Sequence, residues 1–283
     1  MIIDIHTHTF PEKIAAAALK KMQASSHIAL FSDGTEAGLI QSERRAQADV
    51  AVVQPAATNP AKVSHMNDTV IRVNETSRET GLISFGAMHP AFEGWEKELE
   101  RLKAAGVKGI KLHPPYSSVP IDDPRSIAVL RKCRELRLIV LVHSGWDVGL
   151  PESQAALPEK IRRALDAAGP VRLIAGHMGG WRCWEDALRY LLDTGAYLDT
   201  AFSLGAMTPA PDHHPWTREG LALLGTQEFC QLVRAFGADR ILFGTDSPWG
   251  DPKEEVEKIR ALPLTQEERN AILGENAKKL LEI

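Results

Sequence analysis

Residues 107–143, VKGIKLHPPYSSVPIDDPRSIAVLRKCRELRLIVLVH, decide the fold that we predict for this chain. Two short runs rich in branched apolar residues, Val107–Leu112 and Leu138–His143, have the composition of strands. The segment between them, Asp123–Leu136, has the apolar spacing of an amphipathic helix, and an acidic residue just ahead of Pro124 can cap it. The stretch therefore predicts a strand, a helix and a second strand, the unit from which parallel sheets are built.

The same alternation continues along the rest of the chain. Further strands are predicted at Ile2–His6, Val50–Gln54, Leu82–Met88, Val171–Ala175, Ala196–Asp199 and Arg240–Gly244, and further helices at Thr69–Thr80, Trp95–Ala105, Ser153–Ala168, Trp181–Asp193 and Arg218–Phe236. Eight strands that alternate with helices, without a linker between them, predict a single (β/α)8 TIM barrel domain over residues 1–283. An open doubly wound sheet is the alternative, but no Gly-rich phosphate loop follows an early strand. The long segments 10–49 and 201–239 are expected to carry an extra helix or a lid.

Composition and charge narrow the class of protein. The net charge of −4, with no basic block, argues against a general binder of nucleic acid or of anionic membranes. The cysteines Cys133, Cys183 and Cys230 are far apart and form no C-x-x-C, as expected for free thiols in a reducing compartment. No apolar stretch approaches a membrane span, and the start lacks a signal-peptide pattern. We therefore expect a cytoplasmic protein that acts on a small molecule, and leave a homodimer open.

Polar residues that can bind metal follow most of the predicted strands. His6 and His8 end the first strand and, as residues i and i+2, share one face of it. The other strand ends supply His89, Lys111, His113, His143, His177 and Asp246. Each alone has a structural explanation, such as a hydrogen-bonded histidine or a turn-capping aspartate. Together they predict a divalent metal site, because in a barrel these ends form the active-site mouth.

An ordered set of motifs resembles a known family. The motifs are HTH (6–8), GIKLHP (109–114), VHSG (142–145), GHMGG (176–180), ILFGTDSPWG (241–250) and ILGENAKKLL (272–281). Together they resemble the amidohydrolase superfamily and, within it, the amidohydrolase-related (amidohydrolase 2) branch of metal-dependent TIM-barrel hydrolases and decarboxylases. The resemblance extends from Ile2 to Leu281 and implies an active site at the C-terminal ends of the strands.

The resemblance also implies roles for single residues. By motif position, the metal ligands are His6, His8, His143 and Asp246. His177 matches a histidine that lies beside the metal and acts on the substrate. One divalent ion is expected, zinc with manganese as the alternative, because four ligands already suit a catalytic zinc. A second metal bridged by a carboxylated Lys111 is the less favoured arrangement.

Two reactions are compatible with such a site. The first is hydrolysis of a lactone, ester or amide, in which Asp246 accepts the proton of an activated water and His177 stabilises the oxyanion. The alternative is non-oxidative decarboxylation of a small carboxylic acid. The expected substrate-binding residues are Lys111, His113, Trp146, Trp181 and Arg182. A barrel that has lost catalysis and only binds a ligand is the third and least favoured reading.

Some polar residues have no clear role in the sequence. Asp4 shares the strand face of His6, so that it either supports the ligands or fills the barrel interior. The loop residues Asp212, His213 and His214 form either a metal cluster or a solvated lid. His27 and His65 have no supporting context, and we expect surface or helix positions for both. Aromatic residues beyond other strand ends, Phe10, Tyr116 and Trp249, either wall the pocket or pack the loops.

Overall fold

The structure, a computed structural model, describes residues 1–283 and divides into two compact units. The terminal unit contains residues 1–53 and 199–283, and the central unit contains residues 54–198. No helix in either unit is both long and apolar enough to cross a bilayer.

The terminal unit is built on a parallel pair of strands, β1 and β2, in which Ile3 lies opposite Val50. Every residue of β1 is buried, and backbone hydrogen bonds from Ile5 to Phe243 (2.9 Å) and from His8 to Ser247 (2.7 Å) join β1 to the segment that contains β9. The elements of this unit are β1 (Ile3–Thr7), α1 (Glu12–Ser26), α2 (Glu36–Ala46), β2 (Val50–Val53), α10 (Arg218–Leu221), α11 (Thr226–Phe236), η3 (Ala238–Arg240), β9 (Ile241–Leu242), α12 (Pro252–Arg260), α13 (Gln266–Asn270), η4 (Ala271–Glu275) and α14 (Asn276–Leu281).

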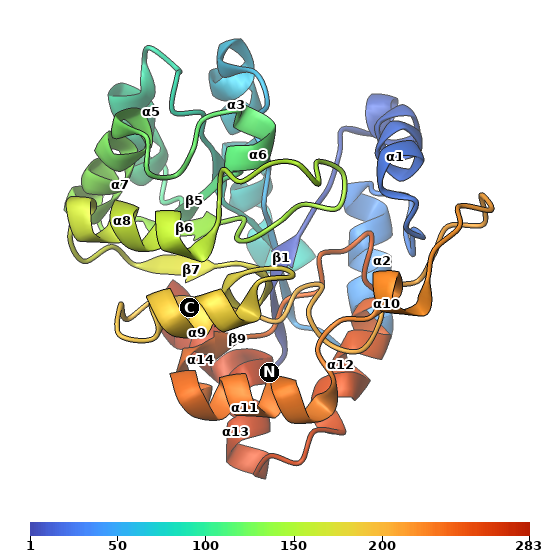
Figure 1. Cartoon of the computed structure of the whole chain (residues 1–283). Coiled ribbons are helices and arrows are strands. Elements are labelled where there is room, and N and C mark those ends of the chain that lie inside the picture. The colour runs from blue at the N-terminus through green and yellow to red at the C-terminus, as the bar shows by residue number, and fades with distance from the viewer. The chain divides into compact units, whose positions relative to one another are not determined.

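The central unit contains five parallel strands in the order β4-β5-β6-β7-β8. Lys111 of β5 lies opposite Leu141 of β6, and β6 is buried along its whole length. Helices α5, α7 and α8 pack in succession beside these strands (Figure 1). The elements are η1 (Pro60–Lys62), α3 (Val63–Glu75), α4 (Ser77–Thr80), β3 (Leu82–Ser84), β4 (Gly86–Ala87), α5 (Trp95–Ala104), β5 (Gly109–Leu112), α6 (Pro114–Ser117), α7 (Pro124–Leu136), β6 (Ile139–Val142), α8 (Pro158–Ala168), β7 (Leu173–Ala175), η2 (His177–Gly179), α9 (Trp184–Leu191) and β8 (Tyr197–Asp199), whose last residue belongs to the terminal unit.

Each predicted strand is present, although the third is interrupted at Phe85. The helix predicted from Ser153 begins only at Pro158, because a proline at the first helical position sets the start. The helix predicted at Arg218–Phe236 is wrong as a single element. It is interrupted at 222–225, where the chain instead pairs with residues 204–206 in isolated bridges.

Candidate metal centre

Three of the predicted ligands meet in the terminal unit. Nε2 of His8 lies 3.0 Å and Nε2 of His6 lies 3.6 Å from Oδ1 of Asp246. Ligand atoms about 2.0–2.2 Å from a tetrahedral zinc ion are separated by roughly these distances. The three side chains therefore fit a divalent metal as they stand, without a change of backbone.

The backbone holds Asp246 in an uncommon conformation. Its φ is +61°, in the left-handed region, where aspartate is one of the few tolerated side chains. The Asp246 N–H donates to the carbonyl of His6 at 2.8 Å, so that β1 supplies both a ligand and the anchor for a second ligand. Strain at a residue with this chemistry is typical of functional sites.

Asp199, which the sequence analysis did not single out, binds the ring of His6. Nδ1 of His6 lies 2.9 Å from Oδ2 of Asp199, and both side chains are buried. A carboxylate on one ring nitrogen fixes the proton there and leaves the other nitrogen, Nε2, to bind metal. Asp199 is the last residue of a predicted strand. The other candidate residues also lie at strand ends, so this position could have indicated Asp199.

Replacing Asp199 by asparagine is expected to weaken zinc binding about 10- to 100-fold, the usual effect of losing such a partner. An amide that donates to Nδ1 leaves the proton on Nε2, which then cannot bind the ion. Chelator competition measures the affinity. Asp193→Asn, which loses an exposed ion pair with Arg162, is the control and should bind zinc as the wild type does. Equal affinity in the Asp199 variant would contradict this role.

Two buried acidic side chains lie next to the ligand set. Burial raises the pKa of Asp4 to about 7, although hydrogen bonds from Thr245 and from the backbone of His6 oppose the shift. Burial, and then the charge of Asp4, raise the pKa of Glu43 of α2 well above its ordinary value. Neither Glu43 oxygen has a partner with hydrogen-bond geometry, so Glu43 is the group of this pair that we expect to stay protonated.

The remaining predicted histidines meet in the central unit. Nδ1 of His143 lies 3.0 Å from Nε2 of His177, and Nε2 of His143 lies 3.0 Å from the carbonyl oxygen of Trp146. A histidine that donates one N–H to a carbonyl presents its second nitrogen as a ligand. Nδ1 of His143 faces His177 and Nε2 faces the Trp146 carbonyl, so the tautomer of the ring decides which nitrogen can bind metal.

Asp147 also lies in this group, and the sequence analysis missed it. Its Oδ2 lies 3.6 Å from Nε2 of His113 and 3.7 Å from Nε2 of His143, so these three side chains are a second group that can hold a metal ion. Oδ1 accepts the backbone N–H groups of Gly149 and Leu150. Asp147 lies in a loop beyond the strand end, where no periodic pattern could have marked it.

His177 is held by an unusual backbone. Its φ is +58° and that of Met178 is +53°, so the chain turns sharply after β7. The indole N–H of Trp184 donates to the His177 carbonyl at 3.0 Å, and the His177 side chain is buried. The backbone of His177 is therefore held in place, and its ring contacts His143.

The loops after β6 and β7 bring the predicted tryptophans together. The backbone N–H of Trp181 donates to the Ser144 carbonyl at 2.9 Å, and the backbone N–H of Trp146 donates to the Trp181 carbonyl at 3.0 Å. The guanidinium of Arg182 lies 5.0 Å from the Trp181 ring, and burial lowers the pKa of Arg182.

Lys111 and His113 come from the next strand of the same sheet. Lys111 is only 1% exposed, an uncommon state for a lysine. The ring of His113 stacks on that of His143 with centroids 4.5 Å apart. His89 is different: it is buried and accepts the N–H of Ala91, and burial lowers its pKa, as expected for a structural histidine.

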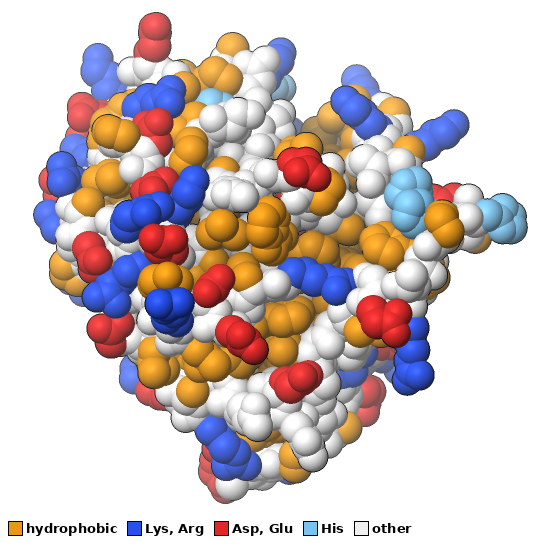
Figure 2. Space-filling model, in the orientation of Figure 1, with side chains coloured by type: hydrophobic (Ala, Val, Ile, Leu, Met, Phe, Trp, Pro, Cys, Tyr) orange, Lys and Arg blue, Asp and Glu red, His pale blue; other side chains and the backbone are white.

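The loop that contains Asp212, His213 and His214 binds to the end of α1. Oδ2 of Asp212 lies 2.8 Å from Nδ1 of His27, and the His27 and His214 rings stack at 3.9 Å. The hydrogen bond from His27 lowers the pKa of Asp212. Histidine side chains gather at this exposed edge, near α1 and α10 (Figure 2). These contacts give His27 a structural role that the sequence did not indicate.

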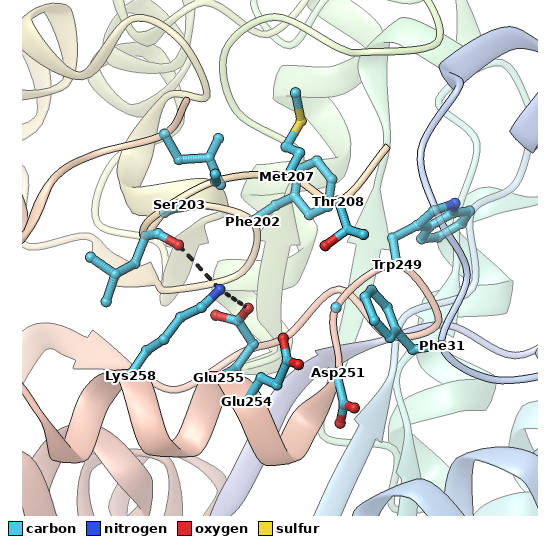
Figure 3. A pocket seen from close by; sticks show the side chains of 14 residues that line it. Phe31, Phe202, Ser203, Met207, Thr208, Trp249, Asp251, Glu254, Glu255 and Lys258 are labelled. Carbon is cyan, nitrogen blue, oxygen red and sulfur yellow. Dashed lines mark hydrogen bonds and ion pairs between the residues drawn. The ribbon is translucent and has the colours of Figure 1, made fainter. Parts of the chain in front are cut away.

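A cavity of about 150 Å³ is lined by Trp249. The Trp249 ring contacts the His8 ring edge-on, with centroids 5.7 Å apart, and also lines the cavity. Figure 3 shows aromatic side chains on one side and the acidic residues of α12 on the other, where Lys258 pairs with Glu255 at 2.6 Å. Trp249 therefore contacts both a predicted metal ligand and this cavity.

Solved structures similar to this chain include a TIM-barrel protein and two decarboxylases. An uncharacterised TIM-barrel protein from Bordetella bronchiseptica is 19% identical, with a TM-score of 0.76 over 99% of this chain and 98% of that one. The 5-carboxyvanillate decarboxylase of Sphingomonas paucimobilis is 13% identical, with a TM-score of 0.68 over 100% and 99%. A dihydroxybenzoic acid decarboxylase from Polaromonas, with bound manganese and the inhibitor 2-nitroresorcinol, is 15% identical, with a TM-score of 0.68 over 99% and 96%. These likenesses confirm the predicted (β/α)8 fold.

The sequence itself identifies the family. No curated protein sequence matches the chain. The model of the amidohydrolase 2 family, described as amidohydrolase, matches residues 3–283, close to the range over which the motifs resemble it. The chain belongs to this amidohydrolase family.

Proposed function

We propose that the chain is a metal-dependent enzyme that removes the carboxyl group of a small carboxylic acid as carbon dioxide. The observation that carries the metal chemistry is the convergence of His6, His8 and Asp246 within 3.0–3.6 Å. The sequence favoured hydrolysis and kept decarboxylation as the alternative. The similar structures support the alternative better, since several of them are decarboxylases.

The proposed metal is one divalent ion, zinc or, as in the Polaromonas structure, manganese. His6, His8 and Asp246 would hold it, and the motif position of His143 makes this residue the fourth ligand that we propose. When bound, such an ion polarises substrate oxygens as a Lewis acid. With a single ion, Lys111 has no second metal to bridge as a carboxylated side chain. We therefore propose that Lys111 stays a cation and faces the substrate.

The residues then have separate tasks in the reaction. Lys111 and Arg182 attract the anionic substrate, and the rings of His113, Trp146 and Trp181 enclose it. The bond between the carboxylate carbon and its neighbour breaks, and carbon dioxide leaves. The neighbouring carbon keeps the electron pair and takes a proton that Asp246 has taken up from solvent water. His177 donates a hydrogen bond to a substrate oxygen on which charge develops.

Hydrolysis of a lactone, ester or amide is the second candidate, favoured by the description of the family. Asp246 would accept the proton of the attacking water and pass it to the leaving group. His177 would stabilise the oxyanion in this reaction as well. Because both reactions use the same side chains, only the product distinguishes them.

Product analysis in deuterated water is the experiment that tests the proposal. The zinc- or manganese-loaded protein is incubated with hydroxybenzoic acids, lactones, esters and amides, and carbon dioxide release is recorded. We expect carbon dioxide together with one deuterium at the carbon that lost the carboxylate. Asp246→Asn, loaded with the same metal, is the control and should release none. Turnover of lactones or amides without carbon dioxide would replace decarboxylation by hydrolysis.

A further inference from the structure

The carboxylate of Asp4 connects the two segments that carry the terminal-unit ligands. Oδ1 accepts the backbone N–H groups of His6 (3.0 Å) and Thr245 (3.1 Å), and Oδ2 accepts the hydroxyl of Thr245 (2.5 Å). Asp4 is completely buried. Three donors on one carboxylate offset part of the cost of burying it.

The partner of Asp4 is the residue that precedes Asp246. The hydroxyl oxygen of Thr245 also accepts the N–H of Ser247 at 3.0 Å. This hydrogen bond joins the two residues that flank Asp246 in the sequence. On the opposite side, the His8 N–H donates to the Ser247 carbonyl at 2.7 Å. Both neighbours of Asp246 are therefore fixed while Asp246 itself has its left-handed φ of +61°.

We propose that Asp4, acting through Thr245, is a positioning residue that keeps Oδ1 of Asp246 within ligand distance of His6 and His8. The inference rests on the proposed metal site and adds a residue that does not touch the ion. A carboxylate suits the position, because the backbone of His6 and both donors of Thr245 bind its two oxygens, whereas an amide has one acceptor oxygen. Loss of the Thr245 hydroxyl leaves the Asp246 backbone without its support, and the ligand atom moves away.

The experiment measures cobalt(II) and zinc binding to metal-free protein. Thr245→Val keeps the branched shape but removes the hydroxyl, and we expect metal affinity about 10- to 100-fold weaker, with an altered visible spectrum of the cobalt form. Thr245→Ser retains the hydroxyl and should restore both. Thr194→Val is the matched control, because its hydroxyl likewise donates to a carbonyl (Leu191, 2.7 Å) and accepts the N–H two residues on (Ala196, 3.3 Å). It should bind metal as the wild type does.

Wild-type affinity and spectrum in Thr245→Val would overturn the role of Asp4. If Thr245→Val does not fold, the same two measurements are made on Asp4→Asn. Asparagine keeps the size of the side chain, but its NH2 group is a donor and cannot accept the Thr245 hydrogen bonds. A wild-type chain that binds neither cobalt nor zinc would overturn the proposed metal site, and the role of Asp4 with it. Metal affinity that falls equally in Thr194→Val would show a general loss of stability and contradict positioning.

Discussion

Replacing Asp246 by asparagine should remove nearly all turnover while part of the bound metal remains. Asparagine can still offer an oxygen at the position of Oδ1, which lies 3.0 Å from His8 and 3.6 Å from His6. It can neither take up nor deliver the proton that either reaction requires. Metal content, by elemental analysis, and turnover of the same preparation give the two readouts.

The contrasting variant in that experiment is His177→Asn. Because His177 is proposed to act on the substrate and not to hold the ion, its metal content should stay near wild type. Turnover should fall by about 10²–10³-fold, the usual effect of removing one oxyanion-stabilising donor. If His177→Asn loses metal as fully as His143→Ala does, His177 is itself a ligand. Nδ1 of His143 lies only 3.0 Å from Nε2 of His177, so either ring could be the ligand by its position. The metal contents of the two variants distinguish them.

The double change His6→Ala and His8→Ala should lower the metal content from about one ion per chain to almost none. The protein should remain folded, because a TIM barrel is stabilised mainly away from its catalytic ligands. Elemental analysis after growth with added zinc gives the stoichiometry, and circular dichroism gives the fold. The matched control, His27→Ala with His214→Ala, removes a stacked pair between the end of α1 and the loop of residues 212–214, and should retain the ion.

Two outcomes would contradict this expectation. Metal lost by the control pair would place an ion on the loop of residues 212–214. A wild-type content of two ions per chain, with activity that depends on bicarbonate during reconstitution, would assign Lys111 as a carboxylated bridge. With one ion, Lys111→Arg should keep the metal and weaken only substrate binding, since the arginine fork has a different geometry.

The fold was predictable because each strand and helix has a local pattern. The predicted strand Leu138–His143 is apolar without interruption up to Val142, as expected for a strand buried on both faces, and β6 is found there. The split of Arg218–Phe236 was not predictable in the same way. It depends on bridges from Leu204 to Leu224 and from Ala206 to Ala222, which are tertiary contacts that helix periodicity does not contain.

The site was predictable where it coincides with strand ends. His6, His8 and Asp246 were found because each follows a recognisable strand, and the first two share a face. Asp199 was missed because its partner is 193 residues away, and nothing in the local sequence relates the two. Asp147 was missed because it lies in a loop, and a loop has no periodic sequence pattern from which the position of a functional residue could be predicted.

The left-handed backbone at Asp246 also limits how this chain can evolve. Glutamate and cysteine bind divalent metals well, but neither adopts a φ of +61° as readily as aspartate does. Exchange of one ligand type for another at this position therefore requires the loop to be rebuilt. Asparagine and glycine both fit the existing backbone and both end the proton transfer. A descendant could lose its activity here by one substitution and keep its fold.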